Sequence, residues 1–380
     1  MNNPAATVPY PTAAQAAPLV SVIVPTYNTE KFLDQALSSI EAQTLPDFEI
    51  ICLNDGSTDG SLAIMQEHAA RDPRIHIIDK QNEGYGASCN RGLEEARGEY
   101  IAIVEPDDWI EPEMFAHMLK YAQGFDETID IIKTPYWRIN CPDTPRQRIL
   151  NCSYRGRINP PKQPFVIGDA AHLLEHHPSI WSALYRREFL LEHDIRFKRI
   201  PGAGWADNPF LVETLCQAKT IVYLDEPFYC YREETAEKSR SLHQKTPLLP
   251  LERWSDMMDV LDRLHVQDER ILRAHYSRGF TYLGGILQYA GMDAPGVKEA
   301  ATSMFRRMKE SIVMADPQLS PGNKALYRKL VGLPPQHVSP LPYLGSLVHE
   351  GAYSVKNTGV KNTFYSVMSY FKYKDVRSGR

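Results

Sequence analysis

The sequence predicts an α/β protein with a Rossmann-like, mostly parallel sheet flanked by helices and a helical extension at the C-terminal end. Between residues 19 and 132, short β-branched runs alternate with segments of helical apolar spacing. Clusters of polar residues follow several of these runs. From about residue 248 the strand pattern disappears and only helical spacing remains.

The expected strands are short and apolar. They cover residues 19–24, 48–53, 75–78, 100–104 and 129–132, with helices between them from residue 30 and over 62–68, 86–97 and 112–121. Pro25 is expected to end the first strand. Parallel strands place their carboxyl ends on one edge of the sheet, so the polar clusters at 26–30, 54–59 and 105–108 should converge there.

The remainder of the chain divides by composition. Helical spacing recurs over 248–264, 268–289 and 297–314. The predicted organisation is a disordered Ala- and Pro-rich tail (1–18), the α/β domain (19–240), a helical domain (241–350) and a basic, aromatic tail (351–380).

Composition excludes several classes of protein. The 380 residues carry 42 Lys and Arg against 47 Asp and Glu, a net charge of −5, which argues against nucleic-acid binding through a basic surface. No uncharged apolar run approaches the roughly 18 residues of a membrane-spanning helix. None of the six cysteines forms a CxxC pair, so we expect reduced thiols and a cytoplasmic location.

The usual glycine-rich nucleotide motifs are missing. The sequence contains neither GxxxxGK[ST] nor a GxGxxG after the first strand. A nucleotide at this sheet would therefore depend on carboxylates and a metal. Asp107 and Asp108 follow the fourth strand and suit Mg²⁺ or Mn²⁺ on a diphosphate. The alternative is an acidic turn that caps the next helix.

An ordered set of motifs resembles the family-two nucleotide-sugar glycosyltransferases. The segments that carry the resemblance are 22–28 (VIVPTYN), 54–59 (NDGSTD), 82–84, 90–93, 98–101, 105–109 (EPDDW), 181–190 (WSALYRREFL), 204–210 (GWADNPF) and 229–232. This resemblance implies the GT-A fold and an inverting transfer of a sugar from a nucleotide carrier.

The resemblance also implies a donor site. Pro25, Tyr27 and Glu30 would line the nucleoside pocket, and Asp55 would accept a hydrogen bond from the uracil ring. Asp107 would hold the ribose or sugar side of the donor.

Two further acids receive catalytic roles from the resemblance. Asp108 would bind the divalent metal, Mn²⁺ or Mg²⁺, and Asp207 would be the general base. Asp207 has a structural alternative as the N-cap of a helix that includes Pro209.

The chain departs from the family pattern at three positions. Glu105 stands where Asp is common, Cys89 where Arg is common, and Ala206 where Glu usually precedes the catalytic Asp. Cys89 removes one expected phosphate contact. Ala206 leaves open how Asp207 is oriented.

Three more residues are candidates for contacts with the acceptor or the diphosphate. Trp181 and Trp205 suit stacking on a sugar, or equally packing in the core. Arg232, with the loop 238–241, could clamp the diphosphate, or the loop could be a solvated turn.

The predicted function is that of a hexosyl- or N-acetylhexosaminyl-transferase in polysaccharide biosynthesis, acting from a UDP-sugar onto a hydroxyl of a glycan or lipid-linked saccharide. The alternatives are a non-catalytic nucleotide-sugar binder and a nucleotidyltransferase. Residues 351–380 carry six Lys and Arg against one Asp, interleaved with aromatics, which suits peripheral contact with the inner face of a membrane. The alternative for this tail is packing on the acidic remainder of the chain.

Overall fold

The computed structural model describes residues 17–145, 147–154, 156–158, 162–233 and 246–375. Contacts divide the chain into two compact units, and each is described here by itself. Unit 1 contains the residues up to 170 and those from 177 to 234, and unit 2 contains 171–176 and the residues from 235 onward. The predicted tail up to residue 16 and the predicted boundary at residue 240 lie outside the described residues.

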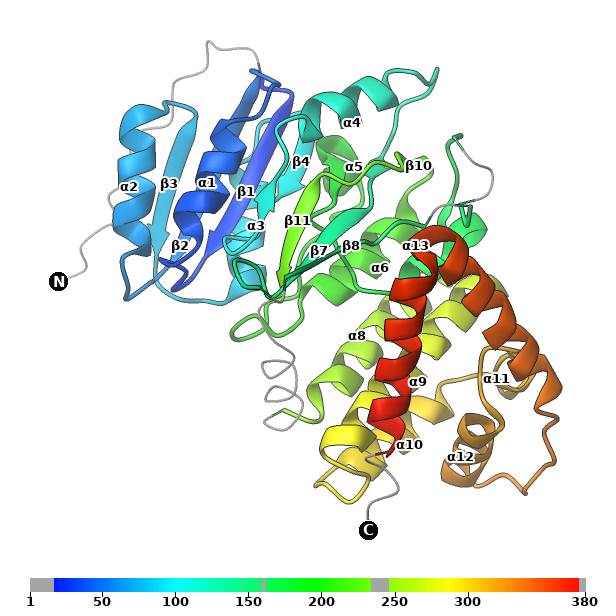
Figure 1. The fold of residues 1–380 in the computed structure, drawn as a ribbon. Coiled ribbons are helices and arrows are strands. Elements are labelled where there is room, and N and C mark those ends of the chain that lie inside the picture. The colour runs from blue at the N-terminus through cyan, green and yellow to red at the C-terminus, as the bar shows by residue number, and fades with distance from the viewer. Residues whose placement is uncertain (1–16, 146, 155, 159–161, 234–245, 376–380) are drawn as a thin grey trace. The chain divides into compact units, whose positions relative to one another are not determined.

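Unit 1 is built on a seven-stranded sheet with the order β10-β6-β9-β4-β1-β2-β3 (Figure 1). Its strands are β1 (Val20–Thr26), β2 (Phe48–Asp55), β3 (Ile75–Lys80), β4 (Tyr100–Ile103), β6 (Ile131–Lys133), β9 (Ala183–Arg186) and β10 (Ile221–Tyr223). All of these strands pair in parallel except β9, which runs antiparallel to both β4 and β6. The predicted α/β class and mostly parallel sheet are confirmed.

The apolar runs of the sequence form the centre of the sheet. Every residue of β1 and β2 is buried, as expected for strands covered on both faces. The helices of unit 1 are α1 (Leu33–Glu41), α2 (Ser61–Arg71), α3 (Tyr85–Glu95), α4 (Met114–Ala122), α5 (Arg187–Glu192) and α6 (Asp207–Gln217). A short 3-10 helix, η1, covers Ile167–Leu174.

The first strand does not end at Pro25, as the sequence had suggested. β1 continues through Pro25 to Thr26 and stays in register with β2. Pairing between β1 and β4 ends at Ile23, so the missing N–H of Pro25 interrupts no ladder on that side. The polar residues after β1 therefore start one position later.

A smaller sheet was not predicted. It has the order β5-β11-β7-β8 and consists of β5 (Trp109–Ile110), β11 (Tyr229–Glu233), β7 (Tyr136–Asn140) and β8 (Arg148–Asn151). β5 begins directly after Asp108, so this sheet attaches the end of the acidic segment to a strand more than 100 residues away.

Unit 2 is helical in the residues that the structure describes. Its helices are α8 (Leu249–Arg263), α9 (Glu269–Tyr289), α10 (Val297–Arg306), α11 (Glu310–Ala315), α12 (Pro321–Val331) and α13 (Leu341–Asp375). Trp254 is fully buried, stacks on His275 at 4.5 Å and donates its Nε1–H to the His275 carbonyl at 2.9 Å. α8 and α9 are therefore locked together at their centres.

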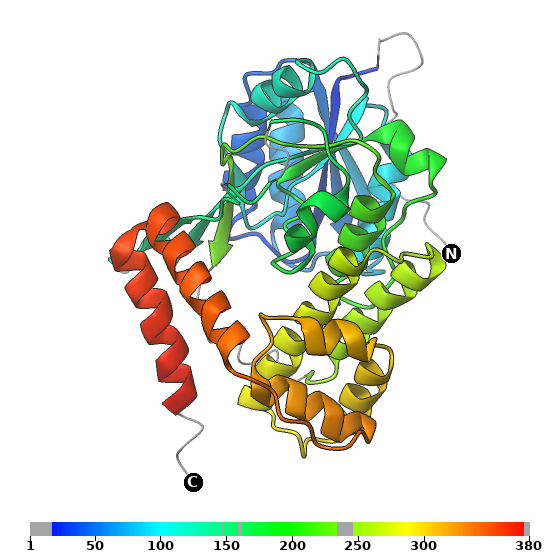
Figure 2. The same cartoon turned by 90° about the vertical axis from the view of Figure 1, so that its right-hand side faces the viewer.

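The C-terminal part of unit 2 differs from the sequence-based expectation in two ways. The predicted helix 297–314 is divided into α10 and α11. The predicted tail from residue 351 is helical as far as Asp375, where it forms the end of the first half and the whole second half of α13, which is interrupted at Gly359 (Figure 2). Within the described part of the chain, no helix combines the length and apolar content needed to cross a bilayer.

The core of unit 1 contains a lysine without a described acidic partner. Lys133 ends β6 and is 2% exposed. Its Nζ donates to the carbonyl and the hydroxyl of Ser179 at 2.9 and 3.1 Å, and contacts the hydroxyl of Ser182 at 3.4 Å. Desolvation lowers the pKa of Lys133 to about 7, because burial penalises the ammonium form.

This burial predicts a pH-dependent stability. Lys133 titrates near 7 when folded and near its usual 10.5 when unfolded, so the unfolded state binds more protons between these values. Relative to Lys133→Met, the wild-type free energy of unfolding should rise with pH in this window by up to about 1.4 kcal/mol per pH unit. Urea unfolding of both proteins at pH 7 and pH 9 measures the difference. An equal change in the two proteins would mean that Lys133 stays charged and hydrated in the folded state.

Candidate functional site

A pocket of about 440 Å³ lies in unit 1, at the carboxyl ends of β1, β2 and β4. Its walls come from five chain segments. They comprise Pro25, Thr26, Tyr27, Thr29, Asp55, Asn82, Gly84, Tyr85, Ser88, Glu105, Pro106, Asp107, Gly202 and Ala203. The three predicted polar clusters thus converge at this edge. No lysine or arginine is among these lining residues, although three carboxylates are.

The carboxylate at the end of β2 is ionised and held in place. Asp55 is 3% exposed and receives a hydrogen bond from the Lys80 ammonium. It also accepts from the backbone N–H of Glu83 at 3.0 Å and of Gly84 at 2.9 Å. Desolvation opposes ionisation, yet these donors together keep the pKa of Asp55 below its usual value. Asp55 is therefore an acceptor for an N–H group at neutral pH.

Gly84 allows the chain to turn tightly beside Asp55. Its φ is +93°, a conformation that favours glycine. A Cβ at this position would also lie 2.6 Å from the carbonyl oxygen of Ile200. The loop before α6 therefore packs directly on the N-terminus of α3, and Gly202 and Ala203 of that loop complete the pocket wall.

Of the three residues expected around the nucleoside, two line the pocket and one does not. Pro25 and Tyr27 line the pocket, and Tyr27 is half exposed. Glu30 is not part of the lining. Its Oε2 accepts from the backbone N–H of Gly60 at 2.6 Å, and its own N–H donates to Asp59. Glu30 thus organises the start of α2 rather than the pocket wall.

A second acid at the pocket, Glu105, has an unusual environment. Tyr85 donates its hydroxyl to Glu105 at 2.6 Å. Desolvation raises the pKa of Glu105 to about 8, and the charges of Asp107 and Asp207 act in the same direction. Without a cation, this group of acids repels itself.

Asp107 and Asp108 have different environments. Asp107 is exposed and lines the pocket. Asp108 is 2% exposed and is not part of the lining. Its two carboxylate oxygens accept from the hydroxyl of Tyr229 at 2.8 Å and from the backbone N–H of Arg232 at 2.7 Å. Burial raises the pKa of Asp108 well above its usual value. Asp108 therefore lies behind the pocket wall, whereas Asp107 is the acid that faces the pocket, and the metal-binding role expected for Asp108 stays a prediction.

Arg232 is also part of this support. Its Nε donates to the backbone carbonyl of Asp107 at 2.8 Å, and its guanidinium lies over the rings of Phe32 and Trp109. Arg232 is 8% exposed and does not line the pocket. It fixes the backbone that carries Asp107. The neighbouring loop 238–241 lies outside the described residues.

Neither tryptophan considered for sugar stacking lines the pocket. Trp181 is 4% exposed and stacks on Tyr229 at 4.0 Å and on Tyr231 at 5.3 Å. Trp181 therefore packs in the core, which was the alternative expectation. Trp205 is half-buried in the loop before α6 and has a positive φ of 55°.

Asp207 begins α6, next to the wall formed by Gly202 and Ala203. The residue at the N-cap position is Ala206, so Asp207 is not the N-cap. The carboxylate of Asp207 accepts from the side chain of Asn208 at 3.1 Å. Burial is the main cause of the raised pKa values of Tyr85 and Glu105, and the charge of Asp207 adds to both. Asp207 is therefore within electrostatic reach of these two pocket residues, meaning close enough for its charge to act on them.

Cys89 and Ala206, two of the positions that depart from the family pattern, are buried next to the pocket residues of α3 and of the loop before α6. Burial first, and the charge of Glu105 second, raise the pKa of Cys89 well above its usual value, so the thiol is neutral. Ala206 is 1% exposed, and a Cβ built on Gly86 would lie 3.4 Å from the Cβ of Ala206. The small residues Gly86 and Ala206 let the N-termini of α3 and α6 approach each other.

Two hydroxyls in the lining were not identified from the sequence. The side-chain oxygens of Thr29 and Ser88 are buried, and neither has a hydrogen-bond partner in the described part of the structure. Buried polar atoms without a partner are uncommon in proteins. Both hydroxyls are thus available to a bound molecule, and only the position of Ser88, one turn into α3 after Gly84, hints at this in the sequence.

The pocket residues fit a divalent cation that is shared with a ligand. In the described part of the chain, no three His, Cys, Asp or Glu side chains form a metal cluster. Mg²⁺, however, is often held by one or two carboxylates together with phosphate oxygens and water. Glu105 and Asp107 offer that pair, and none of the lining residues in the described part of the chain is a lysine or arginine.

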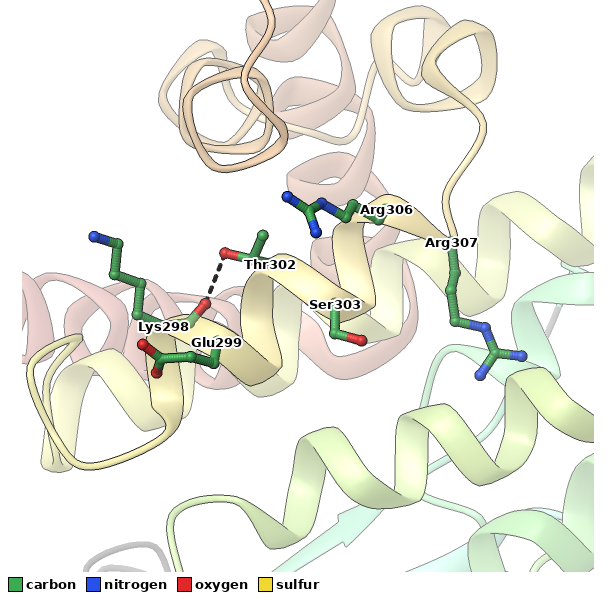
Figure 3. A pocket seen from close by; sticks show the side chains of 6 residues that line it. All are labelled: Lys298, Glu299, Thr302, Ser303, Arg306 and Arg307. Carbon is green, nitrogen blue, oxygen red and sulfur yellow. Dashed lines mark hydrogen bonds between the residues drawn. The ribbon is translucent and has the colours of Figure 1, made fainter.

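A second pocket, of about 460 Å³, lies on α10 in unit 2 (Figure 3). Its lining contains three cationic side chains, one acid and two hydroxyls, and includes Lys298, Glu299 and Arg306. Arg307 at its end pairs with Asp259 and Asp262, each at 2.7 Å. This pocket has neither the convergent acids nor the partnerless hydroxyls of the pocket in unit 1.

Comparison with known proteins agrees with this geometry. Residues 21–193 match the family described as glycosyl transferase family 2. Two relatives come from Bacillus subtilis strain 168. The uncharacterized glycosyltransferase EpsJ is 33% identical over 231 residues, and the putative glycosyltransferase EpsH is 32% identical over 233. Each match covers 57% of this chain and 61% of the relative, so the chain spans about three fifths of the length of these relatives.

Solved structures extend the likeness of fold. S. aureus TarS 1–349, in complex with UDP-GlcNAc, superposes with a TM-score of 0.65 at 20% identity, covering 82% of this chain and 87% of that chain. This identity supports a shared GT-A fold and no more. The matched family model and the two relatives indicate a glycosyl transferase family 2 domain over residues 21–193.

Proposed function

We propose that this chain is an inverting glycosyltransferase that moves a sugar from a UDP-sugar to a hydroxyl of a glycan or lipid-linked saccharide. The observation that carries the proposal is the acidic pocket at the sheet edge, which has an ionised Asp55, a pair of acids at Glu105 and Asp107, and Asp207 within electrostatic reach. The match of residues 21–193 to glycosyl transferase family 2 supports the reaction class. The complex of the similarly folded TarS with UDP-GlcNAc supports the class of donor.

The donor half of the proposal rests on the pocket wall. Asp55 has no proton of its own and would accept from the ring N–H of uracil. Pro25 and Tyr27 would lie against the nucleoside. The hydroxyls of Thr29 and Ser88 would donate to oxygens of the donor, since they have no other described partner.

A divalent metal would be held by Asp107 with Glu105, in place of Asp108. A bound Mg²⁺ or Mn²⁺ would offset the charge of the diphosphate and of the departing nucleotide. The lining provides three carboxylates and no lysine or arginine, so an anionic diphosphate requires such compensation. Tyr85 and the Arg232 guanidinium would keep Glu105 and the backbone of Asp107 in position.

Asp207 would take the proton from the acceptor hydroxyl. An inverting displacement needs the base and the leaving group on opposite faces of the sugar carbon. Asp207 belongs to α6, whereas Glu105 and Asp107 follow β4, so the base and the diphosphate site come from different segments. A positioned general base typically contributes about 10²–10⁴-fold to the rate.

A non-catalytic nucleotide-sugar binder is the second candidate. It is favoured by the neutral Cys89 thiol and by Ala206, which remove an expected cation and an expected acid from the site. The test of Asp207 described next separates the two functions.

Asp207→Asn should lower the rate of UDP release from UDP-sugars by about 10²–10⁴-fold, because the amide cannot accept the proton. Affinity for UDP should change little. The measurement is a screen of UDP-sugar hydrolysis with Mn²⁺ or Mg²⁺, together with calorimetry of UDP binding. Asp194→Asn, an exposed acid in the same unit, is the matched control. A variant as active as wild type would remove Asp207 from the reaction, and UDP-sugar binding without any wild-type turnover would favour the binder.

Asp107 and Asp108 should respond differently to amide substitution. Asp107→Asn should raise the Mn²⁺ concentration needed for UDP binding by roughly ten-fold or more, because it removes a ligand charge. Asp108→Asn should lower the melting temperature and leave the metal requirement near that of wild type, because it disturbs the bonds to Tyr229 and Arg232. Titration of Mn²⁺ with UDP present, and thermal unfolding, measure both effects. The opposite pattern would restore Asp108 as the metal ligand.

Ser88→Ala should weaken UDP-sugar binding by roughly 2- to 12-fold, the effect of one hydrogen bond. The stability of the free protein should stay unchanged, because the hydroxyl has no described partner to lose. Calorimetry of UDP-sugar binding and thermal unfolding test the two halves of this statement, with the exposed Ser303→Ala as control. Lost stability with unchanged affinity would give Ser88 a structural role only.

A further inference from the structure

The first half of α13 exposes a row of apolar side chains. Leu341 is 72% exposed and Val348 is 73% exposed, with Leu344 and Val355 between 41% and 51%. Positions 341, 344, 348 and 355 share one face of an α-helix. Four branched apolar side chains therefore face outward along one stripe.

The opposite side of the same helix is turned inward and carries polar side chains together with two tyrosines. Its half-buried positions are Tyr343, Ser346, Glu350, Tyr353 and Asn357. The hydroxyl of Ser346 donates to the backbone carbonyl of Pro317 at 3.1 Å, which ties this side to the rest of unit 2. A helix on a water-soluble domain normally buries its apolar stripe and exposes its polar face. α13 has the reverse orientation.

Two glycines beside the apolar stripe show that no residue in the described part of the chain covers it there. Gly345 and Gly351 lie beside it, and a Cβ built on either would meet no atom within 4 Å. The stripe is thus open along more than one turn of the helix.

The second half of α13 returns along the first. Gly359, with a φ of +84°, interrupts the helix, and Figure 2 shows the two halves as a hairpin. Polar contacts hold the halves together, since the hydroxyls of Ser354 and Thr363 lie 2.8 Å apart. Val360, just beyond the turn, is 71% exposed. At the turn of the hairpin, polar hydroxyls thus lie between the two halves, while Val360 is exposed.

Charge identifies the kind of surface that fits this hairpin. α13 itself (Leu341–Asp375) contains four Lys against Glu350 and Asp375, a net charge of +2, and the sequence beyond it adds Arg377 and Arg380, in a chain whose total is −5. Lys356 is exposed next to the apolar stripe. Apolar residues flanked by cations suit the headgroup region of an anionic bilayer. A second copy of the chain suits it less, because pairing would bring two basic segments together.

We propose that the α13 hairpin binds the surface of an anionic lipid bilayer, with the stripe of Leu341, Leu344, Val348 and Val355 inserted at the level of the headgroups. The proposal concerns attachment and does not rest on the proposed catalytic function. Electrostatic attraction would bring the helix to the surface, and burial of the stripe would hold it there.

Flotation of the full-length protein with lipid vesicles tests this proposal. Wild type should float with vesicles of phosphatidylcholine containing 30% phosphatidylglycerol, with a partition coefficient roughly ten-fold or more above that for phosphatidylcholine alone. Leu344→Asp/Val348→Asp should lose at least ten-fold of this binding. Ile149→Asp/Leu191→Asp, which places the same charges on exposed apolar residues of unit 1, should bind as wild type.

Three results would overturn the proposal. They are no flotation of wild type, equal flotation of the α13 variant, or a dimer in analytical ultracentrifugation that the α13 variant dissociates while wild type ignores vesicles. Circular dichroism and UDP binding of each variant establish that it is folded. These readouts also keep a failure of membrane binding distinct from a failure of the glycosyltransferase assignment, because UDP binding belongs to unit 1.

Discussion

The site depends on the two hydrogen bonds that the buried carboxylate of Asp108 accepts. This carboxylate joins the segment after β4 to β11 through the hydroxyl of Tyr229 and the backbone N–H of Arg232. A buried carboxyl group is costly unless its oxygens are hydrogen-bonded, and here each oxygen has a donor. The same hydroxyl of Tyr229 accepts from the backbone N–H of Glu105 at 3.0 Å. Both ends of segment 105–108 are therefore fixed by hydrogen bonds, and the side chain of Asp107 faces the pocket.

The acids of the pocket differ in how readily they ionise. Lys80 is a cationic partner of Asp55, whose pKa is lowered, whereas burial raises the pKa of Glu105. With its pKa raised to about 8, Glu105 is mostly protonated near neutral pH, which limits its repulsion of Asp107 and Asp207. A cation bound beside these acids would favour the ionised form of Glu105.

Much of this could be predicted from the sequence, for a physical reason. Strand and turn patterns are local, and the edge of a parallel sheet then brings Asp55 and Asp107 together without further information. That Asp107 rather than Asp108 faces the pocket could not be predicted, because it depends on partners more than 100 residues away on β11. β9 was missed for a similar reason, since its antiparallel place between β4 and β6 is a matter of tertiary pairing.

α13 shows a second limit of sequence patterns: they predict a helix but not the face that it turns inward. Its sequence has apolar positions at helical spacing, and that pattern alone predicts a helix packed on a core. The pattern does not say which face turns inward. In the structure, the carbonyl of Pro317 and the pairing of Ser354 with Thr363 select the polar face, so the apolar stripe is exposed. Leu341 and Val348 are left largely exposed by this orientation. Burial of the stripe at an anionic lipid surface would add apolar burial, and the basic residues that follow the stripe suit such a surface.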